Sequence, residues 1–345
     1  MIYNDLEFHN VVELRTVNGI NGLKLERFPK EIQNTLGDDT HHRGRFFSER
    51  AIGCEIRFVT DADFFSIGLT AIEQDTDIII YQGDFFHSKH TLKAGILTSL
   101  HIEKGTGFNA AQPGIIFQKR FAKKVWRILI GFSGYVFFNY IDTFGYFHRP
   151  PLEDEKPSIK WLAYGSSITY GGQATNYTNC YANQTALNIN ADLYNKGIAG
   201  SCRCEKQIAD FFAKDSEHYD LITLELGINM LGAFSPEEFE LRSSYLVKQM
   251  LEHHQESEIF LITIFPHISS ITKNTESKNY ISFYKFNEIL RGYIKSINSP
   301  KLHLIEGSDI LTDFSFITLD GVHPSDDGHI RMGMNLGRII KSFIN

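Results

Sequence analysis

The pattern of apolar residues changes at a short segment, residues 148–157, which is rich in proline and charged side chains. Such a composition is typical of a linker between domains, because proline and charged groups disfavour a continuous buried element. The chain of 345 residues is also longer than a single hydrophobic core of common size requires. We therefore predict two domains, residues 1–150 and residues 151–345.

Before the linker, short runs rich in β-branched and aromatic residues are separated by turn signals, which favours an all-β sandwich or jelly roll. In residues 54–58 apolar and charged side chains alternate. One face of that strand is therefore expected to meet the core and the other face to meet water. The expected strands are residues 54–60, 64–70, 77–81, 92–103, 114–121, 126–132 and 134–142.

After the linker, the pattern becomes strand followed by helix, repeatedly. The clearest helix start is Ser235, which can cap a helix whose first residue is Pro236, with Glu238 in the capping-box position. Parallel strands joined by helices form a sheet covered on both faces, and sites in such sheets lie beyond the carboxyl ends of the strands. The expected buried strands are residues 159–164, 193–195, 221–226, 259–264 and 302–306.

Charge and composition exclude several functions. The chain has 34 Lys and Arg against 41 Asp and Glu, a net charge of -7, so we expect neither nucleic acid nor an anionic membrane as a partner. Its apolar runs are shorter than the roughly 20 residues that span a bilayer. The four cysteines form no C-x-x-C pair, and residues 1–10 do not read as a secretory signal. These features predict a cytoplasmic protein.

Three short motifs place a polar residue or a glycine directly after a predicted strand. Ser167 lies in Gly-Ser-Ser-Ile-Thr, where a nucleophilic hydroxyl can face a cleft. Gly200 can bring its N–H close to a developing oxyanion, because it has no side chain. Asn229 offers a neutral amide donor for the same charge. Taken singly, a serine-rich turn, a turn glycine or a loop-capping asparagine explains each motif at least as well.

A fourth motif, Asp-Gly-Val-His-Pro, lies in a loop before the last expected helix. His323 can accept the proton of a serine and return it to a leaving group. Asp320 can accept a hydrogen bond from the other ring nitrogen and fix the tautomer. The histidine pairs at residues 41–42, 87 and 90, and 253–254 lack cysteine or carboxylate partners. We therefore predict no metal site.

In combination, the four motifs resemble the sequence blocks of the SGNH or GDSL hydrolases, in the order found in that family. The resemblance covers about residues 158–345 and implies a flavodoxin-like three-layer α/β/α domain with a parallel sheet. It also implies a catalytic triad of Ser167, Asp320 and His323. An oxyanion hole would be formed by Ser167, Gly200 and Asn229.

Two positions depart from the family pattern. Ser166 stands where an aspartate often precedes the nucleophile, which puts the hydrogen bonding of that loop in doubt more than the chemistry. Met230 follows Asn229 where an aspartate is common, and it could present an adaptable apolar wall to a substrate. Tyr170 and Phe316 are further candidates for contact with the substrate, although packing explains either equally well.

A β-sandwich ahead of such a hydrolase is similar to the arrangement in family 2 carbohydrate esterases and some related acyltransferases. This resemblance implies a serine esterase that acts on a small acyl ester, an O-acetyl group on a carbohydrate or glycoside, without a cofactor. Two alternatives stay open: an acyltransferase that uses the same serine with a sugar or other hydroxyl acceptor, and a non-catalytic sugar-binding protein. The acyl length, the alcohol, the role of the β domain and a homo-oligomeric state also stay open.

Overall fold

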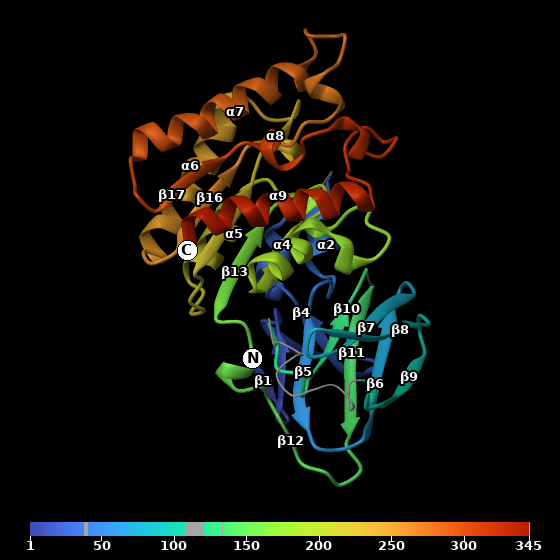
Figure 1. Cartoon of the computed structure of the whole chain (residues 1–345). Helices are drawn as coiled ribbons and strands as arrows, with labels where there is room; N and C mark the ends of the chain where they lie inside the picture. Colours follow the sequence, from blue (N-terminus) through green and yellow to red (C-terminus); the bar gives the residue numbers. More distant parts are fainter. Residues whose placement is uncertain (38–40, 108–119, 133, 345) are drawn as a thin grey trace. The chain divides into compact units, whose positions relative to one another are not determined.

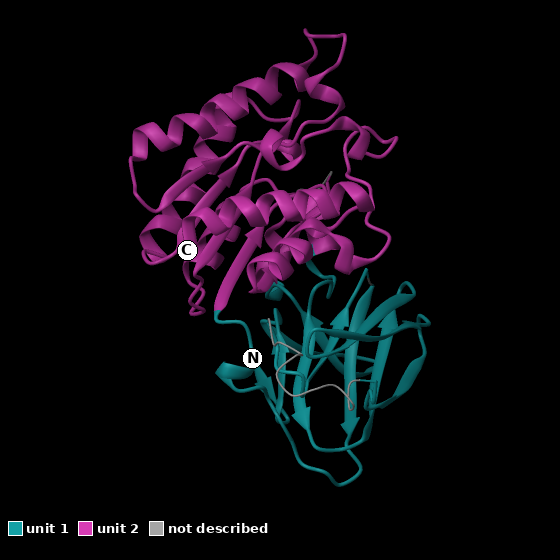
Figure 2. Cartoon of the chain, viewed as in Figure 1, with its two compact units in different colours: residues 1–30, 48–158 teal, residues 31–47, 159–345 magenta. Residues whose placement is uncertain are grey.

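The structure is a computed structural model that describes residues 1–37, 41–107, 120–132 and 134–344. Contacts divide the chain into two compact units: unit 1 comprises residues 1–30 and 48–158, and unit 2 comprises residues 31–47 and 159–345 (Figure 2). Residues 31–47, which the sequence placed in the first domain, therefore group with the second unit. The expected strand 114–121 lies outside the described residues except for its last two positions.

Unit 1 is built from antiparallel strands in two sheets, which confirms the predicted β-sandwich (Figure 1). Within the described residues, one sheet has the order β1-β2-β5-β10-β7-β8 with β12 beside β5, and the other has the order β3-β4-β11-β6-β9. The strands are β1 (Ile2–Tyr3), β2 (Leu6–His9), β3 (Glu13–Val17), β4 (Ile20–Glu26), β5 (Glu55–Thr60), β6 (Phe64–Ile72), β7 (Thr76–Gln82), β8 (Phe85–Leu92), β9 (Leu97–Glu103), β10 (Val125–Ile130), β11 (Tyr135–Asp142) and β12 (His148–Arg149).

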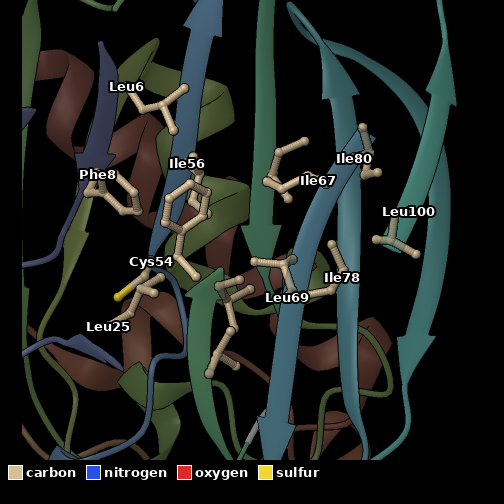
Figure 3. Close-up of a cluster of buried hydrophobic side chains, with 14 of the residues drawn as sticks. Leu6, Phe8, Leu25, Cys54, Ile56, Ile67, Leu69, Ile78, Ile80 and Leu100 are labelled. Atoms are coloured by element: carbon tan, nitrogen blue, oxygen red, sulfur yellow. The ribbon is translucent and has the colours of Figure 1, made fainter. Parts of the chain in front are cut away.

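The core of unit 1 draws side chains from both sheets. Ile56 and Ile80 from one sheet and Ile67 and Leu69 from the other are fully buried in the same cluster (Figure 3). This burial supplies the hydrophobic stabilisation that a single sheet could not obtain alone.

The expectation that β5 exposes a charged face is wrong. All six of its residues are buried, including Glu55 and Arg57. Their charges are paired inside the unit: Arg57 Nε lies 2.7 Å from Glu55 Oε2, and Arg127 Nη2 lies 2.6 Å from Glu55 Oε1. Buried charges persist when they are paired and hydrogen-bonded, so alternation of apolar and charged residues does not by itself indicate a solvated face.

Unit 2 contains a parallel sheet in the order β14-β13-β15-β16-β17. In chain order these strands are second, first, third, fourth and fifth, which is the flavodoxin-like arrangement. The predicted α/β fold is therefore confirmed. After β13 the chain adds β14 on one side and β15 on the other, so the strand order reverses between β13 and β15. Ligands in such folds bind beyond the carboxyl ends of the strands at this point. The strands are β13 (Ile159–Tyr164), β14 (Ala191–Asn195), β15 (Leu221–Glu225), β16 (Glu258–Ile262) and β17 (Leu302–Ile305).

Helices flank this sheet and pack in groups: α4 on α9, α5 on α6, and α6 on α7 (Figure 1). The predicted start of α6 is confirmed, because Ser235 accepts a hydrogen bond from Glu238 N. None of the helices in the described residues is long and apolar enough to cross a membrane. The helices are α1 (Lys30–Thr35), α2 (Arg43–Ser48), α3 (Ser167–Tyr170), α4 (Tyr181–Ile189), α5 (Lys206–Ala213), α6 (Pro236–His253), α7 (Lys278–Ile297), α8 (Gly307–Ile310) and α9 (Asp326–Ile344).

Candidate active site

The turn after β13 presents Ser167 as the first residue of a short helix. Ser166 caps this helix, α3, with its hydroxyl accepting a hydrogen bond from Ile168 N at 3.1 Å. Gly171, with φ of 107°, ends the helix after four residues. Ser166 thus caps the helix with a neutral oxygen, at the position where an aspartate often precedes the nucleophile in SGNH or GDSL hydrolases. The turn holds the Ser167 side chain half-buried at the carboxyl end of the sheet.

Ser167, His323 and Asp320 lie in a continuous chain of hydrogen bonds. The distance from Ser167 Oγ to His323 Nε2 is 2.7 Å, and the distance from His323 Nδ1 to Asp320 Oδ2 is also 2.7 Å. Gly172 leaves room for this arrangement, since a Cβ there would lie 3.2 Å from His323 Cδ2. The three predicted side chains are therefore within the reach that proton transfer requires.

Asp320 is held by its own loop. Its Oδ1 accepts hydrogen bonds from the backbone N–H groups of Val322 at 2.8 Å and His323 at 2.9 Å. Partial burial opposes ionisation of this carboxyl, but these bonds and the bond from the His323 ring outweigh it and hold its pKa below the usual range. Asp320 is consequently an ionised acceptor at neutral pH, and it fixes Nδ1 of His323 as the donor.

The two predicted oxyanion donors outside the nucleophile turn lie on adjoining loops. Gly200 adopts φ of +68°, a conformation that favours glycine. The loop before Gly200 runs alongside the turn that carries Ser167, because Ile198 N donates a hydrogen bond to Gly165 O at 2.9 Å. Asn229 Oδ1 accepts from Cys202 N at 3.0 Å, which leaves its Nδ2 group as the donor for another acceptor.

Glu225 is a residue near the site that the sequence reasoning missed. This fully buried carboxyl at the end of β15 accepts hydrogen bonds from Ser166 N at 2.6 Å and Thr169 Oγ1 at 3.1 Å. A Cβ at Gly165 would lie 2.6 Å from Glu225 Oε2, so the glycine permits this close approach. The signal was present as one charged residue within the apolar run 221–226, because a charge in a buried strand requires specific partners.

The three predicted substrate-contacting residues differ in exposure. Met230 is fully buried, and Tyr170 is 6% exposed. The Tyr170 ring packs against Phe47 of α2, with ring centroids 5.3 Å apart. Phe316 is half-buried and so retains accessible surface. Contact of these side chains with a substrate stays a prediction.

Helix α2 also belongs to the surroundings of the site, and the sequence reasoning missed this as well. At Gly44 a Cβ would lie 2.8 Å from Ser201 Oγ, so the helix backbone runs close to the residue after Gly200. The contact between Phe47 and Tyr170 ties the same helix to the end of α3. Helix α2 therefore packs beside the short helix that carries the predicted nucleophile and the loop that carries a predicted oxyanion donor.

Comparison with known families shows what class of protein carries this site. The model of the GDSL-like lipase/acylhydrolase family matches residues 158–341, more than half of the chain. The chain belongs to this family of ester-hydrolysing enzymes. A search of curated protein sequences finds no match.

Solved structures share the two-part fold at low sequence identity. A salicylyl-acyltransferase, SsfX3, from a tetracycline biosynthetic pathway is 15% identical with a TM-score of 0.77, covering 99% of this chain and 95% of that chain. A putative GDSL-like lipase from Bacteroides ovatus is 17% identical, TM-score 0.68, with coverage of 92% and 91%. A family two carbohydrate esterase from Clostridium thermocellum, in complex with cellohexaose, is 17% identical, TM-score 0.60, with coverage of 85% and 93%.

Proposed function

We propose that the protein is a serine esterase that hydrolyses a small acyl ester, an O-acetyl group on a carbohydrate or glycoside, through an acyl-serine intermediate. The observation that carries this proposal is the pair of 2.7 Å hydrogen bonds that join Ser167 to His323 and His323 to Asp320. A hydroxyl, an imidazole and a carboxylate in this order form the arrangement that activates a serine for attack on an ester. Membership of the acylhydrolase family supports the same chemistry.

In the proposed cycle His323 takes the proton of Ser167 as Oγ attacks the ester carbonyl. The negative charge on the carbonyl oxygen is held by the N–H groups of Ser167 and Gly200 and by the Asn229 amide. When the C–O bond to the alcohol breaks, His323 donates its proton to the leaving oxygen, and the acyl group stays on Ser167. Water then attacks the acyl carbonyl as His323 takes its proton, the bond to Ser167 breaks, His323 returns the proton to Ser167 Oγ, and the acid is released. Each step uses a group of the chain itself.

The fold supports a carbohydrate ester as the substrate class. The relative with bound cellohexaose combines the same two kinds of domain over 93% of its length. We propose that this chain likewise accepts an acylated sugar, with Phe316, Tyr170 and Met230 as candidate residues of the acyl or sugar site. Phe316 is the first to substitute, since it is the most accessible of the three.

A second candidate function is acyl transfer. It is favoured by the likeness to the salicylyl-acyltransferase SsfX3, which extends over 99% of this chain. The chemistry up to the acyl-serine would be identical, and a hydroxyl acceptor would then replace water. Product analysis with and without added sugar or alcohol separates the two: transfer gives a new ester, whereas hydrolysis gives only the free acid.

The test of the esterase proposal is hydrolysis of p-nitrophenyl acetate by wild type and Ser167→Ala. We expect the variant to lose at least about 1,000-fold in kcat, because the nucleophile is removed. A fluorophosphonate probe should label wild type at Ser167, located by peptide mass spectrometry, and should leave the variant unlabelled.

Ser166 provides a matched internal control, since it is an adjacent serine that is buried as a helix cap. The probe should not label it. Equal slow rates for wild type and Ser167→Ala, with no labelling, would favour the non-catalytic sugar-binding alternative and overturn the proposal.

A further inference from the structure

The side chain of Arg43, in α2, lies against Gly200. A Cβ built on Gly200 would lie 2.9 Å from Arg43 Cδ and 3.1 Å from Arg43 Nη1. The guanidinium group therefore lies directly against a glycine that we propose as an oxyanion donor. Glycine at this position serves two needs: it adopts the positive φ, and it leaves space for the arginine.

Arg43 is fixed at this place by its helix. One residue further along the helix, Gly44 packs on Ser201, and one turn further, Phe47 packs on Tyr170. These two contacts, three residues apart, fix the position of α2 within unit 2. Arg43 is therefore carried by an element that is held in place.

The charge of Arg43 is available to a ligand. Its side chain is exposed, and within the described part of the chain it makes no hydrogen bond or ion pair. The protein as a whole carries a net charge of -7, so a cation that pairs with none of the described carboxylates, beside the proposed reaction centre, is a local positive site. A guanidinium presents parallel N–H donors that match the two oxygens of a carboxylate.

We propose that Arg43 is a specificity-determining residue that binds an anionic group, a carboxylate, on the ester substrate. This inference rests on the proposed esterase function and adds the charge of the substrate to it. The carboxylate lies either on the alcohol, as in an acylated acidic sugar, or on the acyl chain, and Arg43 recognises the same group in both cases.

Two pairs of esters of similar shape test the proposal. In the alcohol pair, 4-carboxyphenyl acetate is compared with its neutral amide, 4-carbamoylphenyl acetate. In the acyl pair, mono-4-nitrophenyl adipate is compared with the 4-nitrophenyl ester of adipic acid monoamide. In at least one of the two pairs, wild type should show a higher kcat/KM for the charged ester than for the neutral ester. That preference should weaken as salt is added, since the carboxylate binds an exposed cation.

Substitution of the arginine should remove this preference. We expect Arg43→Met, which keeps an unbranched stem over Gly200, to lose roughly 10-fold or more in kcat/KM for the charged ester. The loss for the neutral ester should be less than about 3-fold. Arg43→Lys should keep part of the preference. Arg338→Met, which removes an exposed arginine of α9 in the same unit, should leave both rates unchanged.

The outcomes separate this proposal from the esterase function on which it rests. If Ser167-dependent hydrolysis is observed but neither pair shows a charge preference in wild type, the proposal is overturned and the esterase function stands. An equal loss on charged and neutral esters in Arg43→Met would also overturn it, because the arginine would then act on packing or on the oxyanion. Should Arg43→Met fail to fold, the salt dependence of wild type and the Arg43→Lys rates decide.

Discussion

Glu225 places a carboxyl group beneath the turn that carries Ser167. Burial raises the pKa of this carboxyl to about 7, and the hydrogen bonds from Ser166 and Thr169 counteract only part of that shift. In the folded protein the group therefore keeps its proton at pH values where the unfolded chain, with an ordinary glutamate, has released it.

This difference makes the free energy of unfolding depend on pH. Between pH 4.5 and about 7 the folded state holds one proton more than the unfolded state, so the Glu225 contribution to stability falls as pH rises. The size is about 3 kcal/mol at about 1.4 kcal/mol per pKa unit. Glu225→Gln, which cannot ionise, should abolish this contribution. Urea unfolding of both proteins at pH 4.5, 6 and 8 measures this contribution. If the free energy of unfolding changed with pH equally in the two proteins, the raised pKa of Glu225 would be contradicted.

At the scale of elements, His329 joins three parts of unit 2. This buried residue of α9 accepts a hydrogen bond from Tyr181 N, at the start of α4, on Nδ1 at 3.2 Å. Its Nε2 lies 2.9 Å from Gly172 O, in the loop that follows α3. Burial lowers the pKa of His329 to about 4, and the bond to Gly172 O opposes the shift only in part. The neutral ring thereby ties α9 and α4 to the nucleophile turn.

Acid should weaken this junction. Between pH 6.5 and about 4 the unfolded histidine is protonated while the folded one is not, so stability falls by about 3 kcal/mol as pH decreases through this range. The contribution is opposite in sign to that of Glu225, and in wild type the two partly cancel between pH 4.5 and 6.5. His329→Gln should lose the acid-side decrease. Chemical denaturation from pH 4 to 7 checks this, and an unaltered pH slope in the variant would refute it.

The elements of unit 2 were largely predictable because each strand is a short apolar run followed by a turn signal. The prediction 159–164 matches β13 at both ends, and the expected β15 differs only at its last residue. The candidate site could be proposed for the same reason, since Ser167 and Asn229 lie within four residues of the ends of β13 and β15. Side chains at strand ends of a parallel sheet meet at one edge whatever the intervening helices contain.

Other elements could not be predicted because their placement depends on distant partners. Strands β1 and β2 have only two and four residues, and β4 contains Gly22 at φ of +97°, so local propensity was weak. Helix α2 has only six residues, too few for a recognisable period. Its position follows from contacts with Ser201 and Tyr170, far away in sequence. The position of Arg43 beside Gly200 consequently could not be predicted from the sequence, whereas Ser167 could be predicted as the nucleophile.

At the scale of the whole molecule, the chain passes between the units three times, at residues 30–31, 47–48 and 158–159. A fragment of residues 159–345 would therefore lack α2. We expect this fragment to melt at a lower temperature than the intact chain and to hydrolyse p-nitrophenyl acetate roughly 10-fold or more slowly, because α2 supports the loops at Ser201 and Tyr170. Calorimetry and initial rates measure both effects.

A synthetic peptide of residues 30–48 supplies the control for this experiment. Added to the fragment in excess, it should recover part of the lost rate, whereas a peptide with Phe47→Ala should recover less, since it lacks the ring that packs on Tyr170. A fragment as active and as stable as the intact chain would show that α2 is dispensable.

The threefold passage of the chain also restricts how such a protein can diversify. A crossover in the gene at the codon for Ile159 would attach a new partner to the hydrolase, but it would discard the guanidinium that lies against Gly200. If Arg43 sets the preference for a charged ester as proposed, that preference would be inherited with the codons for residues 31–47, separately from the codons for Ser167 and His323. On this proposal, gene shuffling at residues 148–157 would change which esters are preferred while leaving the predicted triad in place.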